Sequence, residues 1–224
     1  GVITTDAVIS QAMLQKATSD AVKKSFNMIS VDRDTSTNDS LMVMANGLAE
    51  NAEINAEGAD YDTFYEAMLY VLTFLAKKMA ADGEGASKLI ECKVINAASE
   101  EQAVTLSKSV ITSNLTKAAV YGNDANWGRI LCAMGYSSVQ FDPDKIDLTI
   151  EGRETEDGPL TAGVSLKLVE NGVGTDYSEE VATEILKSKI VTAIADMKCG
   201  TACATAWGCD LTHEYVNINA DYRS

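Results

Sequence analysis

The sequence has few of the features that would point to a membrane protein or to a histidine-dependent hydrolase. It contains one histidine, two prolines and no apolar run approaching the roughly 20 residues of a membrane helix. The longest apolar run, residues 68–75, is interrupted by Tyr70 and Thr73. A single imidazole argues against a Ser-His-Asp triad, and no membrane association is expected. The N-terminus lacks a basic region followed by an apolar stretch, so we expect no secretory signal and a cytoplasmic location.

Basic residues are scarce as well. Lysine and arginine number 18 against 33 aspartates and glutamates, which gives a formal net charge of −15. Such a surface repels phosphate backbones, so we expect no nucleic-acid partner. The five cysteines form an odd set in a chain large enough to fold without disulfides. Without a secretory signal, we expect them to be reduced thiols in the cytoplasm.

The residues that are present predict a globular protein of mixed class, since 46% are hydrophobic and 23% charged. Apolar periodicity predicts helices that start near Asp6 and at the capping boxes of Thr63 and Ser99, with others over 127–134 and 179–188. Residues 41–45 fit a helix or a strand equally well. Strand-like patterns lie between the helices, at 26–31, 88–95, 118–121, 146–150, 164–169, 190–195 and 202–207. This interleaving favours an α/β or α+β class with layered helices and sheet.

Two segments resemble metal sites, and the spacing argues against both. Residues 32–36 look like the opening of a calcium loop, but its sixth and twelfth positions hold Thr37 and Val43 instead of glycine and glutamate. We therefore interpret this segment as a polar loop of self-hydrogen-bonding turns. A Cys3His zinc site could in principle be formed by Cys199, Cys203, Cys209 and His213, but these four residues lack the close pairing of zinc knuckles. We therefore expect three buried thiols, a surface histidine and no bound metal.

Two glycine-containing segments fit either a ligand contact or an ordinary structural role. At 83–85, Glu84 projects between two conformationally permissive glycines, which suits a ligand or a plain helix-to-strand turn. Residues 122–129 combine polar groups, an aromatic ring and an arginine. That set suits a small polar ligand or a helix cap equally well.

Seven segments are distinctive when taken together and in order: ITTDA at 3–7, SFN at 25–27, DTSTND at 34–39, DGEGA at 82–86, GNDANWGR at 122–129, ATAWGCDL at 204–211 and INADYR at 218–223. They resemble the β chain of the ornithine acetyltransferase (glutamate N-acetyltransferase) family of arginine biosynthesis. The resemblance covers essentially the whole chain, so we expect 1–224 to be one such β chain. An internal division near 120–145 is left open.

The resemblance implies a precursor that cleaves itself before a threonine, which becomes the first residue of the β chain and the nucleophile. By this register the threonine precedes Gly1 by three residues, and no catalytic residue is expected within the chain itself. Thr4 and Thr5 match a later threonine-aspartate element of the family and do not take that role. The fold implied is an α/β (α+β) sandwich of helices and mixed sheets, completed by a separate α chain in an α2β2 heterotetramer.

The activity implied is ping-pong acyl transfer. N-acetylornithine gives its acetyl group to the threonine, ornithine leaves, and glutamate takes the acetyl group. A threonine amine can serve as base for its own hydroxyl, so no histidine is needed. The resemblance implies no cofactor. Acetyl-CoA is a co-substrate in some family members, and nothing in the sequence decides whether it is one here.

The resemblance also implies three substrate-binding residues, Glu84, Asn219 and Ser224. A carboxylate at Glu84 suits the ammonium group of ornithine. The family commonly ends in threonine, so Ser224 keeps the hydroxyl and loses a methyl group. We expect the apolar residues of the C-terminal segment, Tyr215, Val216, Ile218 and Tyr222, to dock it to the rest of the protein.

Other departures from the family pattern bear on loop shape and on the cysteines. Arg33 stands where the family commonly has glycine, and Cys199 and Cys203 do not match family features, which favours a non-catalytic role for them. The alternative function is an N-terminal-nucleophile amidohydrolase or aminopeptidase, in which water replaces the acceptor amino acid. A non-catalytic binding subunit is the third.

Overall fold

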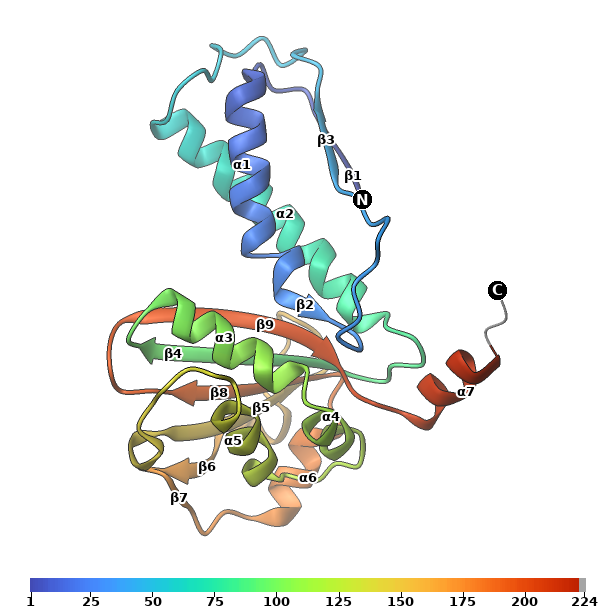
Figure 1. Cartoon of the computed structure of the whole chain (residues 1–224), viewed down its shortest axis with the longest axis vertical. Helices are drawn as coiled ribbons and strands as arrows, with labels where there is room; N and C mark the ends of the chain where they lie inside the picture. Colours follow the sequence, from blue (N-terminus) through green and yellow to red (C-terminus); the bar gives the residue numbers. More distant parts are fainter. Residues whose placement is uncertain (222–224) are drawn as a thin grey trace. The chain divides into compact units, whose positions relative to one another are not determined.

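The computed structural model describes residues 1–221, and its fold divides into two compact units (Figure 1). Unit 1 comprises residues 1–27 and 34–76, and unit 2 comprises residues 28–33 and 77–224. Residues 120–145, where the sequence suggested an internal division, lie within unit 2. Within residues 1–221, no helix has the length and apolar character to cross a membrane. Ser224, one of the three expected binding residues, lies outside the described residues.

Unit 1 packs two helices against two short parallel strands. β1 (Val2–Thr5) pairs with β3 (Met42–Ala45), and the helices are α1 (Gln11–Lys23) and α2 (Ala59–Ala81), whose last residues belong to unit 2. Side chains from both helices share one core. The buried core consists of Ala17, Ala21, Ile54, Tyr61, Met68 and Leu72. The sequence fitted residues 41–45 to a helix or a strand equally well, and the structure shows a strand, β3.

Both helices of unit 1 begin elsewhere than the capping patterns predict. The N-cap of α1 is Ser10, whose hydroxyl accepts a hydrogen bond from the Met13 amide, because residues 6–9 are held in extended backbone pairing instead. α2 starts at Ala59, and Thr63 lies inside it with its hydroxyl bonded to the Ala59 carbonyl at 2.9 Å. Tertiary pairing and helix propagation thus override two local capping signals.

Unit 2 is built on a seven-stranded mixed sheet with the order β2-β9-β4-β8-β5-β6-β7. Two pairs are parallel, β2 with β9 and β4 with β8, and the other four are antiparallel. The strands are β2 (Ile29–Ser30), β4 (Leu89–Ala97), β5 (Asp147–Arg153), β6 (Leu166–Glu170), β7 (Val173–Gly174), β8 (Ile190–Asp196) and β9 (Ala202–Cys209). All but β7 overlap strands that the sequence predicts.

The helices of unit 2 cover one face of this sheet. They are α3 (Glu100–Ile111), α4 (Asn114–Tyr121), α5 (Trp127–Gly135) and α6 (Glu179–Leu186), and the chain ends in α7 (His213–Asp221). Alternate residues along the strands point into the core beneath them. The fully buried side chains include Ile90, Leu106, Ile111, Met134, Leu148, Ile150, Leu168 and Ile185. The sheet and its helical layer confirm the predicted α/β (α+β) class.

Two of the predicted strands, at 118–121 and 26–31, are wrong in full or in part. Residues 118–121 belong to α4, because the Ser113 hydroxyl accepts from the Thr116 amide and starts a helix that runs to Tyr121. Residues 26–28 form a 3-10 turn, which leaves only Ile29 and Ser30 as strand β2. The Ser99 capping box is confirmed, since its hydroxyl accepts from the Gln102 amide at 3.1 Å.

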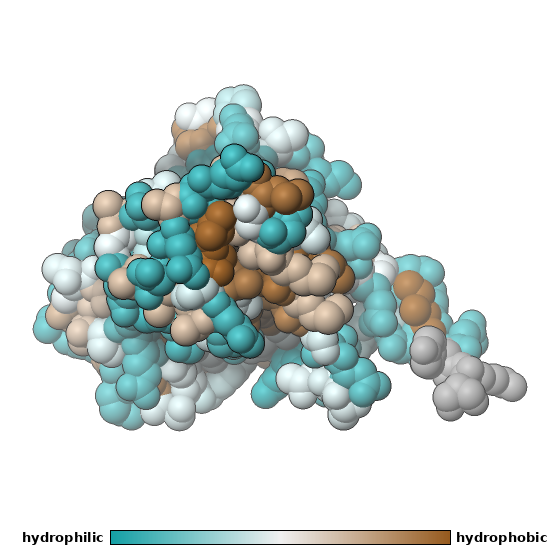
Figure 2. All heavy atoms as spheres, turned by 90° about the horizontal axis from the view of Figure 1, so that it is seen from above, coloured by the Kyte–Doolittle hydropathy of each residue, from teal (hydrophilic) through white to brown (hydrophobic). Residues whose placement is uncertain are grey.

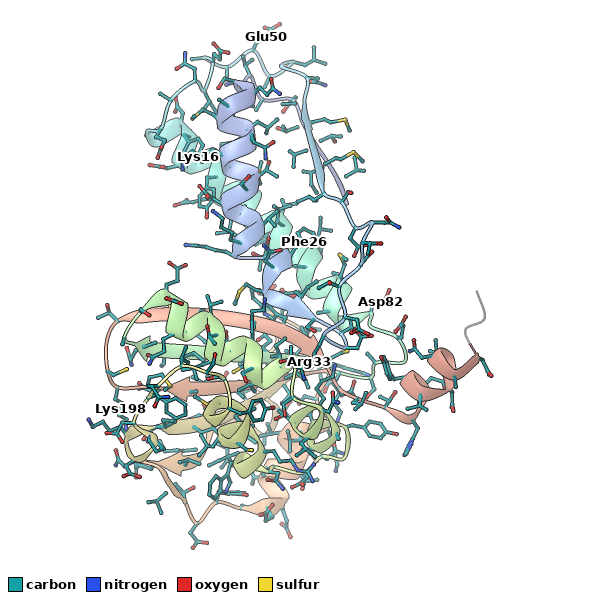
Figure 3. All side chains as sticks on the ribbon, in the orientation of Figure 1. Lys16, Phe26, Arg33, Glu50, Asp82 and Lys198 are labelled. Carbon is teal, nitrogen blue, oxygen red and sulfur yellow. The ribbon has the colours of Figure 1, made fainter. Side chains whose placement is uncertain are left out.

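The pKa of Asp147 in the folded protein determines how this residue's contribution to stability changes with pH. Partial burial alone would raise the pKa of Asp147, but hydrogen bonds from Lys198, the Asn171 amide and Lys167 outweigh it and lower the pKa to about 2. Figure 3 labels Lys198 in the turn between β8 and β9. A lowered carboxyl pKa contributes stability above the unfolded-state pKa of about 3.9, and this is lost as the pH falls towards 2.

We therefore expect Asp147→Asn to destabilise the protein by roughly 1–2 kcal/mol at pH 7. The difference from the wild type should disappear between about pH 4 and pH 2, where the native carboxylate is protonated. Urea unfolding at several pH values measures this. A difference that stays constant down to pH 2 would contradict the electrostatic origin.

Candidate functional site

Glu84 lies in a tight turn between α2 and β4. Figure 3 labels Asp82 where the chain leaves α2 and enters this turn. Gly85 has a φ of +67°, a conformation that a side chain would strain. A Cβ on Gly83 would lie 2.8 Å from the Cys209 sulfur, so the turn packs closely against the end of β9. The two glycines allow this close approach and leave the Glu84 side chain exposed.

The first turn of α7 is attached to the same turn. The Thr212 hydroxyl donates to the Gly85 carbonyl at 2.7 Å and accepts from the Tyr215 amide at 3.3 Å. The Tyr215 hydroxyl in turn donates to the Asp32 carboxylate at 2.9 Å. A Cβ on Gly85 would come within 3 Å of Glu214, so only glycine permits this approach. α7 is therefore fixed to the turn through its first residues.

Glu84 and Asn219 meet in space although 135 residues separate them in the chain. The Asn219 side-chain amide donates to the Glu84 carboxylate at 3.2 Å and to the Tyr215 carbonyl at 3.0 Å. Both side chains are exposed. A carboxylate beside an amide offers a negative charge for an ammonium group, together with both hydrogen-bond donors and acceptors. Two of the three expected binding residues thus lie together, as a carboxylate–amide pair.

The apolar residues of α7 do not dock as the sequence suggested. Val216 is 60% exposed and Ile218 38% exposed, and α7 has no buried residue. Hydrophobic side chains of α7 lie on the surface in Figure 2. Only Tyr215 of the expected anchors is half-buried, and its hydroxyl bonds to Asp32. Tyr222 lies outside the described residues, so the described part of the C-terminal segment is held by hydrogen bonds at the start of α7.

The sequence left two roles open for the segment 122–129, a ligand contact or a helix cap, and the structure shows the helix cap. Asn126 caps α5 by accepting from the Arg129 amide, and the Arg129 guanidinium donates to the Leu115 carbonyl at 3.1 Å. Asn123 accepts from Lys88 at 2.5 Å. Burial lowers the pKa of that lysine. The segment therefore joins helices α4 and α5 to β4.

The cysteines and the histidine lie in different environments. Cys199 and Cys203 are exposed, Cys209 is buried, and His213 is exposed with its ring against that of Tyr121 at 5.9 Å. Burial raises the pKa of the Cys209 thiol above its ordinary value. Within residues 1–221, no three histidine, cysteine, aspartate or glutamate side chains come close enough to hold a metal ion. The expectation of buried thiols is thus wrong for Cys199 and Cys203.

Three buried polar residues beside this site were missed by the sequence reasoning. Asp210, Thr212 and Lys117 are 3%, 7% and 2% exposed. The Lys117 ammonium group donates to the Val31 carbonyl, next to Cys209. For Asp210 and Thr212 the sequence held a signal, because both polar residues lie within three residues of the end of the mainly apolar strand β9. Nothing in the sequence distinguished Lys117 from a solvated lysine.

The fold is α/β, and the carboxylate–amide pair joins the turn between α2 and β4 to α7. Comparison with known proteins identifies the family within this class. The ArgJ family model matches residues 1–224, so the chain belongs to the ArgJ family. This agrees with the family resemblance found in the sequence.

Curated relatives carry the same family name. The chain is 48% identical to arginine biosynthesis bifunctional protein ArgJ 1 of Clostridium acetobutylicum, over 99% of this chain and 52% of that protein. It is 47% identical to arginine biosynthesis bifunctional protein ArgJ of Caldanaerobacter subterraneus subsp. tengcongensis, over 99% of this chain and 53% of the relative. The chain thus spans about half the length of the curated relatives it matches.

A solved structure confirms the fold. The crystal structure of arginine biosynthesis bifunctional protein ArgJ from Bacillus halodurans matches with a TM-score of 0.89 and 43% sequence identity. The match covers 99% of this chain and 98% of that chain.

Proposed function

We propose that this chain is the β chain of an ornithine acetyltransferase, a glutamate N-acetyltransferase of arginine biosynthesis. The observation that carries the proposal is the ArgJ family match over residues 1–224, in relatives about twice as long. The pairing of Glu84 with Asn219 supports it, because these are two residues that the family resemblance selects for substrate binding.

The reaction we propose runs in two half-reactions through a threonine upstream of Gly1. The threonine hydroxyl loses its proton to the α-amine of the same residue and attacks the acetyl carbonyl of N-acetylornithine. The amide bond breaks, and ornithine leaves with the proton on its amine. The glutamate amine then attacks the acetyl-threonine ester, which forms N-acetylglutamate and restores the threonine hydroxyl.

The carboxylate–amide pair would bind the substrate while these bonds change. The Glu84 carboxylate suits the side-chain ammonium group of N-acetylornithine, and exposure in this chain leaves it accessible. The Asn219 amide can donate to a substrate carboxylate or carbonyl. We propose that Ser224, outside the described residues, adds a hydroxyl to the same site.

The remaining parts of the proposal concern the whole protein. We propose that the α chain of the same precursor supplies the oxyanion donors, that the assembly is an α2β2 heterotetramer in the cytoplasm, and that it needs no cofactor. Use of acetyl-CoA for direct acetylation of glutamate belongs to the same proposal, as a second acetyl donor for the same threonine. An amidohydrolase would instead pass the acetyl group to water.

Expression of the complete precursor tests the proposal. We expect two co-purifying chains, a threonine at the N-terminus of the smaller one, and one acetyl group on that residue after brief exposure to N-acetylornithine, detected by mass spectrometry. Added glutamate should remove the acetyl group as N-acetylglutamate. Release of free acetate regardless of glutamate would favour the amidohydrolase, and an unmodified threonine in an inactive protein would overturn the proposal.

Asn219 gives a prediction within this function. Asn219→Ala should raise the KM for N-acetylornithine about tenfold, as expected when a ligand group loses its hydrogen-bond partner. The melting temperature should stay within about 1 °C of the wild type, because Asn219 is exposed on a helix without buried residues. Asn217→Ala on the same helix is the control and should change neither quantity. A lowered melting temperature with an unchanged KM would assign Asn219 a structural role.

A further inference from the structure

A buried aspartate lies directly behind the turn that carries Glu84. Asp210 is 3% exposed and follows the last residue of β9. One carboxylate oxygen accepts from the Ser87 amide at 2.8 Å and from the Lys88 amide at 3.1 Å, and the other accepts from the Ser87 hydroxyl at 2.5 Å. Burial of a carboxylate is unfavourable unless its oxygens are hydrogen-bonded, and three donors from the turn meet this need.

Thr212 continues the same connection on the other side. Its hydroxyl donates to the Gly85 carbonyl at 2.7 Å and accepts from the Tyr215 amide in the first turn of α7. Thr212 therefore binds the middle of the turn and Asp210 its end next to β4, and Thr212 also binds the helix that carries Asn219. We call these two residues the clasp.

The clasp fixes the separation of two groups that would otherwise move independently. Glu84 and Asn219 are both exposed, and the bond between them, at 3.2 Å, is a single contact in water. An exposed contact of this kind is weak against competing water. The partly buried hydrogen bonds of the clasp act on the backbone beneath both side chains. Together with the bond from Tyr215 to Asp32, they are contacts that hold the pair in one geometry.

We propose that Asp210 and Thr212 are positioning residues that fix the Glu84–Asn219 pair and thereby select the length of the substrate's side chain. This inference rests on the proposed function, because it concerns how that site distinguishes substrates by the length of their side chains. A carboxylate held in one place distinguishes a three-methylene amine from a four-methylene one, which places its ammonium group farther away. A carboxylate on a loose turn can follow either ammonium group and loses this discrimination.

The test uses the complete self-cleaved enzyme with N-acetylornithine and with the longer N-acetyllysine. In Asp210→Ala, we expect the KM for N-acetylornithine to rise about tenfold or more with kcat changed less than threefold. The preference for N-acetylornithine over N-acetyllysine should fall at least fivefold, since one methylene is worth about 10- to 200-fold in a rigid site. Amide hydrogen exchange at Ser87 and Lys88 should become faster.

Three further variants separate positioning from simple destabilisation. Asp210→Asn keeps an oxygen for the Ser87 and Lys88 amides, so its preference should stay within about twofold of the wild type. Thr212→Val removes the other half of the clasp at equal volume, and should lower the preference even if Asp210→Ala does not fold. Asp147→Ala removes another aspartate, at the start of β5, that accepts from lysines and from a backbone amide in the turn between β6 and β7, and should lower the melting temperature without changing the preference.

An unchanged preference in both Asp210→Ala and Thr212→Val, in an enzyme whose wild type transfers acetyl, would overturn the clasp and leave the proposed function standing. Equal loss of preference in Asp147→Ala would also overturn it, because general destabilisation would then explain the result. A wild type that acetylates neither threonine nor glutamate would overturn the proposed function and this inference together.

Discussion

Glu84→Gln is expected to reduce kcat/KM for N-acetylornithine by about ten- to a hundredfold, the loss of one charge-assisted hydrogen bond. Glutamine keeps the size and the hydrogen-bonding oxygen but removes the negative charge that we propose pairs with the substrate ammonium group. The Glu84 side chain is exposed and its partner in this chain is Asn219, so the melting temperature should change little. Steady-state kinetics with N-acetylornithine, together with thermal unfolding, measure both quantities.

The matched control is Glu180→Gln, which removes one exposed negative charge from the first turn of α6. It should leave kcat/KM within about twofold of the wild type, because long-range charge effects are screened by salt. Normal turnover of N-acetylornithine by Glu84→Gln would remove this residue from the binding site. Equal losses in both variants would point to net charge alone.

Gly152→Ala is expected to cause the largest loss of stability, about 3 kcal/mol. A Cβ at this position of β5 would overlap the Ser188 hydroxyl and the backbone carbonyl of Ile185, at the end of α6. The carbonyl cannot rotate away as a flexible side chain could, so α6 must move from the sheet and open the core beneath it. For a chain of this size, the melting temperature should fall by roughly 6–12 °C.

Gly135→Ala provides the comparison for this variant. Gly135 ends α5, and a Cβ there meets no atom within 4 Å. Alanine favours helices over glycine, so this variant should be neutral or more stable by up to about 1 kcal/mol. Equal stability of Gly152→Ala and the wild type in urea unfolding would show that β5 and α6 accommodate a methyl group between them.

Several features of the protein follow from local sequence alone. The strands predicted at 88–95, from alternating polar and apolar residues, and at 190–195 are confirmed, and both lie in the centre of the sheet. The Ser99 capping box is confirmed because its residues bond within one turn and need no distant partner. Family resemblance, carried by short motifs along the chain, selected Glu84 and Asn219 before any geometry was known.

Other features depended on tertiary contacts that no local pattern contains. Residues 118–121 have a strand-like composition, yet a capping serine and the packing of α4 on its neighbours make them helical. Thr63 has capping-box spacing but lies within α2, because a helix extends wherever its apolar face is buried.

Sequence by itself determined the class of the protein and singled out two residues that lie together in space, since apolar periodicity and short motifs are properties of neighbouring residues. Only the tertiary structure brought Glu84 and Asn219 to 3.2 Å of one another and placed Asp210 behind them. The physical reason is that a buried carboxylate needs donors, and here they come from backbone amides 122 and 123 residues away. Such a pairing is decided by the folding of the whole unit, because both partners are ordinary polar groups until the chain brings them together.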